Sequence, residues 1–160
     1  METPSITPER WAELGQDMAR MYATAYFLTT DGILICAIRE PVDEGRTEIA
    51  VYIDGYIEWK HAADLVTDPD ELPDPARRFW RQRRMARYSP AKRKNIEKRL
   101  GKRQAKQFFP DLHETRYRIS PLWPKAKAFC AHLRRQNPGL VEITREQHQA
   151  ALEAKEAPDA

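Results

Sequence analysis

The stretch YATAYFLTTDGILICAIRE, residues 22–40, decides the fold. It holds two runs rich in β-branched and aromatic residues on either side of Asp31-Gly32, and an Asp-Gly pair in this setting is a strong signal for a β-hairpin. A second turn signal, PVDEGR at residues 41–46, and a third strand-like run follow. The pattern predicts an antiparallel meander of three or four strands over residues 23–60.

A helix is predicted ahead of this meander, over residues 8–22. Trp11, Leu14 and Met18 recur at helical spacing and give the segment one apolar side. Thr7 is a favoured residue for the N-terminal cap. We expect this helix to pack on one face of the meander.

The C-terminal part has the pattern helix, strand, helix. KAKAFCAHLRRQN, residues 125–137, predicts a helix, and LVEIT, residues 140–144, predicts a short strand that returns to the sheet. The predicted fold class is α+β: an N-terminal helix on a small antiparallel β-meander, a basic helical segment, and a C-terminal helix-strand-helix. A chain of 160 residues is expected to form a single domain. Its expected parts are helix and meander (1–62), an acidic, Pro-rich linker (63–75), the basic helical segment (76–107), a helix and short strand (108–145), and a C-terminal helix with a frayed tail (146–160).

The formal net charge of +3 conceals a strong segregation of charge along the chain. Residues 1–76 contain 5 Lys/Arg and 16 Asp/Glu, whereas residues 77–106 contain 14 Lys/Arg and a single Glu. Charge asymmetry of this size indicates a polyanionic partner or a charged protein surface.

Two basic helices are predicted within this segment. ARRFWRQRRMAR, residues 76–87, can place its apolar side chains on one side of a helix and most of its arginines on the other. Ser89 then suits an N-terminal cap and Pro90 a first helical position, so a second helix is expected from there to residue 107.

The second basic helix carries a row of lysines. Lys94, Lys98, Lys102 and Lys106 recur every four residues and would line one side of a helix over about 18 Å. Like charges at this spacing cost roughly 0.2–0.5 kcal/mol per pair, and Glu97 is the single acid in the helix. An anion that neutralises the row would explain it, and a phosphate backbone is the commonest such surface.

We therefore expect a non-enzymatic protein that binds nucleic acid or a nucleoprotein complex through its basic helices. Lysine rows position a protein on phosphates and do not read sequence. Aromatic residues among the arginines are candidates for stacking on unpaired bases. The predicted contacts are Arg77, Arg81, Arg84, Arg87, Lys92, Lys94, Lys98, Arg99, Lys102 and Lys106, with Trp80 and Tyr88 as the stacking candidates.

Other interpretations of the same charges stay open. The basic side can be a solvated face, it can be neutralised by the acidic residues 64–74, or it can dock on an acidic protein surface. Small, charge-segregated chains are also typical of accessory proteins of phages and mobile elements. In that alternative the protein binds and inhibits a larger nucleic-acid machine, such as a CRISPR or restriction complex, and its acidic half occupies a basic groove.

Motifs for metal or cofactor chemistry are missing from the sequence. The four histidines are scattered, and the two cysteines, Cys36 and Cys130, lie far apart within apolar patterns. Neither the spacing of a zinc site nor a glycine-rich phosphate-binding motif occurs. We expect reduced core cysteines, no metal and no cofactor.

One constellation resembles a family of enzymes. Asp31 lies at a hairpin turn, and Glu58-Trp59-Lys60 forms an E-x-K pattern after strand-like residues. This order is similar to the layout of metal-dependent nucleases of the PD-(D/E)xK type. The resemblance implies that two acids hold Mg²⁺ and that the lysine helps to activate water. The plain alternative places Glu58 and Lys60 on the solvent face of a strand.

No apolar run approaches the roughly 20 residues that a membrane-spanning helix needs. The N-terminal sequence METPSITPERWAELG lacks the basic flank and apolar centre of a signal peptide. A cytoplasmic protein without membrane contact is expected.

Overall fold

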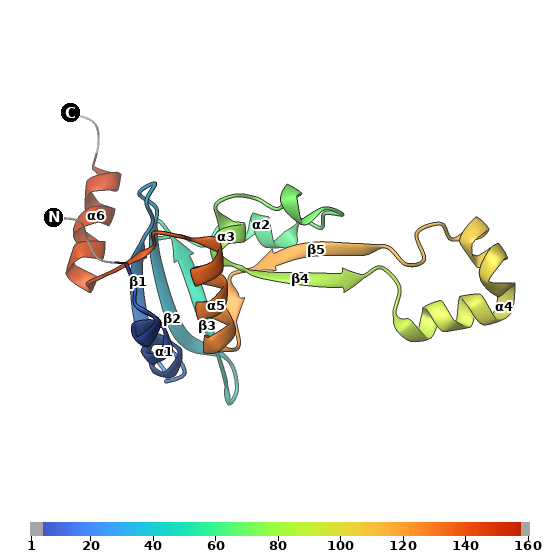
Figure 1. The fold of residues 1–160 in the computed structure, drawn as a ribbon, viewed down its shortest axis with the longest axis horizontal. Helices are drawn as coiled ribbons and strands as arrows, with labels where there is room; N and C mark the ends of the chain where they lie inside the picture. Colours follow the sequence, from blue (N-terminus) through green and yellow to red (C-terminus); the bar gives the residue numbers. More distant parts are fainter. Residues whose placement is uncertain (1–4, 158–160) are drawn as a thin grey trace.

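A computed structural model describes residues 5–157 and shows an α+β fold in two parts (Figure 1). Residues 81–120 form a long projection, which we call the arm. The described residues before and after them, 5–80 and 121–157, form the body, and both described ends of the chain lie at the side of the body away from the arm.

A five-stranded sheet is the centre of the body. Its strands lie in the order β6-β3-β2-β1-β7, and every neighbouring pair is antiparallel. The first three strands along the chain, β1 to β3, form the predicted meander, and β6 and β7 are the two edge strands of the sheet. They span Thr24–Leu28 (β1), Leu34–Asp43 (β2), Arg46–Ile53 (β3), Leu122–Trp123 (β6) and Val141–Ile143 (β7).

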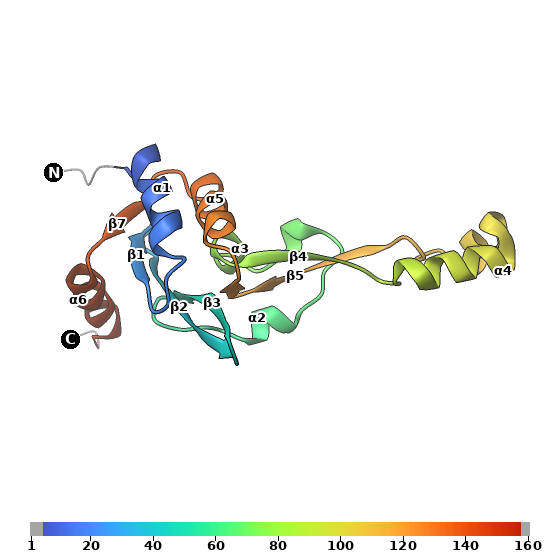
Figure 2. The ribbon, with the colours of Figure 1, turned by 90° about the horizontal axis from the view of Figure 1, so that it is seen from below.

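Two helices cover one face of this sheet. α1 (Pro8–Asp17) and α5 (Ala126–Gln136) pack side by side on it (Figure 2). Phe27, Ile35 and Val51 point from the sheet into this layer and are completely buried. Burial of apolar side chains at this interface supplies the main free energy that holds the body together.

The N-terminal helix is shorter than the sequence predicted. The Thr7 side chain caps its first turn, as expected, but the helix ends at Asp17 and not at residue 22. Arg39 of β2 donates from Nε to the carbonyl of Met18, at 2.6 Å, and so binds the helix end. Tyr22 has a left-handed backbone (φ 63°) and is exposed, because the chain reverses here into β1.

The opposite face of the sheet carries α6 (Arg145–Glu156). Tyr26 and Phe27 alternate along β1, so Tyr26 points to this side, where its ring lies 4.9 Å from that of His148. β7 returns to the sheet beside β1, which confirms the predicted C-terminal helix-strand-helix.

The acidic, Pro-rich segment is fastened to the arm. The short helix α2 (Lys60–Ala63) precedes it, and it holds the 3₁₀-helix η1 (Pro69–Glu71). Val66 exchanges two backbone hydrogen bonds with Tyr117 of the arm, at 2.9 and 2.7 Å. α3 (Ala76–Phe79) then leads into the arm.

The arm is a two-stranded ribbon with a helical tip. β4 (Arg81–Ala86) and β5 (Thr115–Ser120) pair over six residues each, and α4 (Pro90–Phe108) forms the tip (Figure 1). The predicted helix over residues 76–87 is therefore wrong beyond Phe79. The distant segment TRYRIS supplies a complete strand partner, and this tertiary pairing overrides the local helical pattern.

The predicted second basic helix is also interrupted. α4 begins at Pro90 with Ser89 as its cap, as expected, but Gly101 adopts φ 77° and ψ 157° and breaks it into two pieces. Residues with a side chain rarely adopt this backbone conformation, which explains why a glycine stands there. Within residues 5–157 no helix is both long enough and apolar enough to cross a membrane.

Candidate nucleic-acid interface

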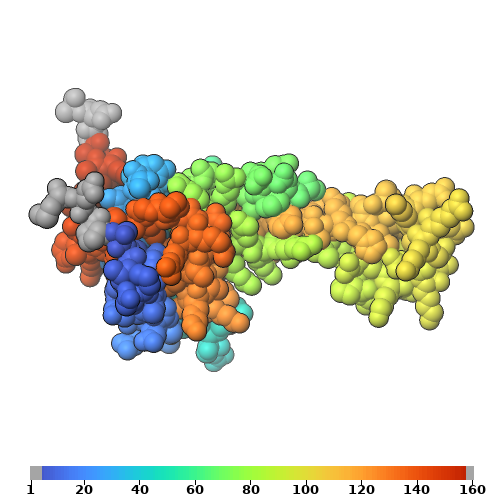
Figure 3. All heavy atoms as spheres, in the orientation of Figure 1, coloured from blue at the N-terminus to red at the C-terminus, as the bar shows by residue number. Residues whose placement is uncertain are grey.

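The charge segregation of the sequence becomes a spatial segregation in the structure. The arm contains 14 Lys/Arg and 3 Asp/Glu, a net charge of +11, and the rest of the chain contains 13 Lys/Arg and 21 Asp/Glu, a net charge of −8. In the space-filling view the outer part of the arm stands clear of the body, while the acidic segment lies against the ribbon near its base (Figure 3). The positive charge is therefore held at a distance from most of the negative charge of the same chain.

The ribbon gathers arginines on one of its two faces. Residues directly opposite each other in an antiparallel pair share a face, and Arg83 lies opposite Arg118. Arg81 lies opposite Ser120, and Met85 lies opposite Arg116. We call the surface formed by these residues the arginine face: Arg81, Arg83, Met85, Arg116, Arg118 and Ser120.

The other face of the ribbon anchors the arm. Ile119 points to this side and is 1% exposed, within the core of the body. Tyr117 lies two residues earlier on the same side and packs against that core. The arginine face therefore points away from the contact that fixes the ribbon to the body.

Three arginines of this face have no acidic partner. Arg116 lies 3.8 Å from Glu114, but within the part of the chain that the structure describes no carboxylate lies within 4.0 Å of Arg81, Arg83 or Arg118. Like charges directly opposite in a sheet pair destabilise it. The face thus presents a concentrated positive charge that the protein itself does not neutralise.

Three of these arginines were not predicted as site residues from the sequence, namely Arg83, Arg116 and Arg118. In the segments RQRRMAR and TRYRIS, every second residue is a candidate for one face of a strand. That alternation is a signal for such a face, but it becomes visible only when residues 81–86 are assigned to a strand.

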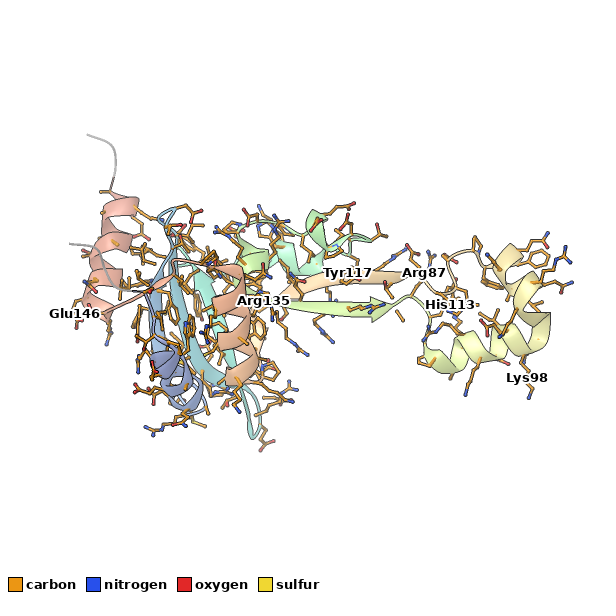
Figure 4. The ribbon with its side chains drawn as sticks, viewed as in Figure 1. Arg87, Lys98, His113, Tyr117, Arg135 and Glu146 are labelled. Carbon is orange, nitrogen blue, oxygen red and sulfur yellow. The ribbon has the colours of Figure 1, made fainter. Side chains whose placement is uncertain are left out.

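An ion-pair cluster joins the ribbon to the tip. Arg87 contacts Asp111 at 2.5 Å and Glu114 at 3.3 Å, and the hydrogen bond that Arg87 donates to Glu114 is the main cause that raises the pKa of Arg87. His113 Nε2 lies 3.0 Å from Glu97 Oε1. Figure 4 shows Arg87 and His113 at this junction. Arg87 was predicted as a phosphate contact, but its charge is compensated within the arm.

A small apolar cluster holds the tip together. Ala105 and Leu112 are buried, and the rings of Tyr88 and Phe109 meet edge to face at 6.2 Å. The ammonium group of Lys92 lies 5.4 Å from the centre of the Tyr88 ring. Tyr88, a predicted stacking residue, is therefore half-buried and already contacted on its ring.

The lysine row of the tip is divided. Lys94 and Lys98 precede the bend at Gly101, and Lys102 and Lys106 follow it, so the expected continuous row along one helix is wrong. All four lysines are exposed, and Lys98 lies at the outer end of the arm (Figure 4). Among the described residues, no acidic partner lies within 4.0 Å of the predicted tip contacts: Lys92, Lys94, Lys98, Arg99, Lys102 and Lys106.

Two predicted site residues at the base of the arm belong to the body. Trp80 is 1% exposed and lies in the core, so its predicted role in base stacking is wrong. Arg77 donates from Nη1 to the carbonyl of Asp70 at 2.8 Å and lies 3.9 Å from the carboxylate of Asp74. The acidic segment thus neutralises the charge of Arg77. Arg81 and Arg84, which were also predicted as contacts, lie on the ribbon.

The residues of the nuclease-like pattern lie outside strands. Glu58 and Lys60 are exposed, 4.0 Å apart, in the segment after β3, so their predicted position on a strand is wrong. Asp31 lies in the turn between β1 and β2. Hydrogen bonds from Thr29 and then Arg78 lower the pKa of Asp31. No group of three or more His, Cys, Asp or Glu in residues 5–157 has the arrangement of a metal site.

A groove of about 1020 Å³ lies on the described body between α1 and α5. Arg39 and Cys130 contribute to its walls. Every nitrogen of the Arg39 guanidinium donates to a backbone carbonyl or to Thr47. Burial raises the pKa of Cys130 to about 11, so the thiol is protonated at neutral pH. Cys36 is likewise buried and unpaired, as the sequence predicted.

Comparisons of the chain with protein family models, with curated proteins and with solved structures gave no match.

Proposed function

We propose that this protein is a non-enzymatic nucleic-acid-binding protein that contacts phosphates with its arm. The observation that carries the proposal is the net charge of +11 on a projecting arm, against −8 on the rest of the chain. A polyanion is repelled by the body and attracted by the arm, so the charge pattern orients the protein during approach.

The unpaired cations of the arm support the same function. Each Lys or Arg that neutralises a phosphate releases condensed counterions, and this release supplies much of the binding free energy. Cations that already have an acidic partner, such as Arg87, contribute less, because their ion pair within the protein would have to break before they bind a phosphate. The exposed lysines of the tip, and Arg81, Arg83 and Arg118 of the arginine face, have no such cost, whereas Arg116 lies 3.8 Å from Glu114.

The test is binding of the purified protein to labelled DNA and RNA, measured by fluorescence anisotropy between roughly 50 and 300 mM salt. We expect affinity to fall steeply as salt rises. The variant Lys98→Glu/Lys102→Glu should bind more weakly and lower the slope of log K against log[salt] by about two, because two phosphate contacts are lost.

The matched control is Lys125→Glu/Lys127→Glu. Both lysines are exposed on the body at α5, so the change in net charge is the same. We expect the control to retain most of the affinity and its slope. Absence of binding at low salt, or equal losses in both variants, would overturn the proposal. The same measurement with Mg²⁺ added would reveal cleavage of the nucleic acid. The variant Glu58→Ala, measured under that condition, tests the nuclease-like alternative.

The second candidate is an accessory protein that binds and inhibits a nucleic-acid machine through protein–protein contacts. The net charge of −8 outside the arm favours it, because an acidic body suits the basic groove of such a machine. The acidic segment between α2 and α3 would be part of that surface. In this case Lys98→Glu/Lys102→Glu would leave partner binding intact, whereas charge reversal at Asp68 and Asp70 would weaken it.

A further inference from the structure

We propose that the arginine face of the ribbon binds in the major groove of double-stranded DNA, with Arg83 and Arg118 at the centre of the contact. This inference rests on the proposed function and names its substrate class. Its starting point is the direct opposition of two arginines that have no acidic partner among the described residues.

The dimensions of the ribbon fit this groove. Two paired strands lie about 4.8 Å apart, and six residues extend over about 20 Å. The major groove of B-form DNA is about 12 Å wide and admits a two-stranded ribbon. The major groove of A-form RNA is deep and narrow, and side chains cannot read it. The shape therefore favours duplex DNA over duplex RNA.

The composition of the face argues against single strands. Proteins that bind single-stranded nucleic acid stack bases on aromatic side chains. The arginine face consists of arginine, methionine and serine, and its ribbon neighbour Tyr117 points to the other side. Stacking platforms are thus missing from the face that carries the charge.

Arginine also supplies the chemistry that a groove requires. A guanidinium donates two parallel hydrogen bonds to O6 and N7 of guanine, which is the commonest specific contact in the major groove. Arg83 and Arg118 come from different strands with their side chains next to each other, so they can reach neighbouring base pairs. The tip lies further along the arm, where its lysines can contact phosphates of the same duplex.

The experiment compares three labelled nucleic acids of one guanine-containing sequence at about 100 mM salt: duplex DNA, duplex RNA and single-stranded DNA. The wild-type protein should bind duplex DNA at least about tenfold more tightly than the other two. Arg83→Lys/Arg118→Lys keeps both positive charges but removes both guanidinium groups, and with them the paired hydrogen bonds. This variant should lose that preference and keep the salt slope, because lysines still neutralise phosphates.

The matched control is Arg134→Lys/Arg135→Lys, which makes the same change at two exposed arginines of the body, on α5. It should retain the preference for duplex DNA. A second measurement leaves the protein unchanged: duplex DNA with 7-deazaguanine lacks the N7 acceptor and should bind the wild type more weakly but not the ribbon variant.

The outcomes separate this inference from the proposed function. Equal affinity for the three nucleic acids, or a preference that survives Arg83→Lys/Arg118→Lys, would overturn the groove contact and leave a phosphate-binding arm. An insensitivity of the wild type to 7-deazaguanine would overturn it as well. Absence of binding to all three would overturn both.

Discussion

Arg83 and Arg118 face each other directly across the β4–β5 ribbon, and neither has a carboxylate within 4.0 Å among the described residues. A fold selected for stability alone would place opposite charges at such a pair. The ribbon instead keeps a repulsive pair on the face that points away from its anchor on the body. Folding stability therefore does not account for this pair.

This repulsion can be tested by a substitution that acts in opposite directions on stability and binding. Arg118→Glu replaces the repulsion by an attractive cross-strand pair with Arg83. We expect the free energy of unfolding to rise by about 0.2–1 kcal/mol, measured by urea denaturation, and nucleic-acid affinity to fall. Arg83→Glu/Arg118→Glu restores a like-charge pair, so the stability gain should disappear. A destabilised Arg118→Glu variant would contradict the repulsion.

Trp80 should act as an anchor of the arm and not as a binding residue. It is 1% exposed, and its indole Nε1 is buried without a hydrogen-bond partner. Trp80→Ala should lower the free energy of unfolding by about 3–5 kcal/mol, because it removes a large buried side chain. Trp80→Phe keeps an aromatic ring and removes the unpaired donor, so it should cost clearly less.

Urea denaturation followed by circular dichroism measures both variants. Trp59→Ala is the control, because Trp59 is 59% exposed on the body. Its effect should stay within about 0.5 kcal/mol, as is usual for surface positions. An unchanged stability of Trp80→Ala would show that the base of the arm does not depend on this residue.

The protein should lose stability as the pH falls below neutral. Burial is the main cause that lowers the pKa of His132, and Arg135 adds to it, while the hydrogen bond to the Arg77 carbonyl opposes them. The pKa of His148 is lowered by burial too. At high pH these histidines are neutral in both states. Below about pH 6.5 these histidines bind protons in the unfolded chain but not yet in the folded chain. The free energy of unfolding therefore falls as the pH drops, until the pH reaches the lower pKa of the folded state.

The urea midpoint measured between about pH 7.5 and 5 tests this dependence. His132→Gln does not titrate and keeps an N–H donor for the Arg77 carbonyl, which His132 Nε2 contacts at 3.1 Å. We therefore expect the variant to show a shallower loss on acidification. An unaltered slope in His132→Gln would exclude this histidine as the source.

The parts of the fold that the sequence predicted are those with local signals. Asp31-Gly32 lies between two strand-like runs and fixes a hairpin, and Thr7 marks the start of α1; both signals are complete within a few residues. The ribbon depends on a partner over 30 residues away, since Arg83 pairs with Arg118. The local pattern of residues 81–86 favours a helix, and the pairing with the distant segment makes them a strand.

The candidate site was predicted in part for the same reason. The lysines of the tip follow from helical spacing, because α4 starts where its cap and proline indicate. The arginine face requires the strand register, and the division of the lysine row requires the backbone of Gly101. A glycine in a helical pattern either stays within the helix at a cost in stability or interrupts the helix, and sequence alone does not separate the two cases.

The bend of the tip should depend on the backbone of Gly101. With φ 77° and ψ 157°, a side chain at this position is strained by about 1–3 kcal/mol, although the space around it is open. Gly101→Ala should therefore loosen the second piece of α4 without disturbing the body. Hydrogen exchange should show faster exchange of the amides of residues 102–108, because the buried contact of Ala105 is weakened.

Gly45→Ala is the matched control for this prediction. Gly45 has φ 74°, lies in the turn between β2 and β3, and likewise has open space around it. In this variant the same backbone strain arises in the body, so amide hydrogen exchange should become faster near that turn and not in the tip. If Gly101→Ala left residues 102–108 as protected as before, the bend would be set by packing around Ala105 and not by the glycine backbone. The two lysine pairs would then keep their positions whatever residue stands at 101.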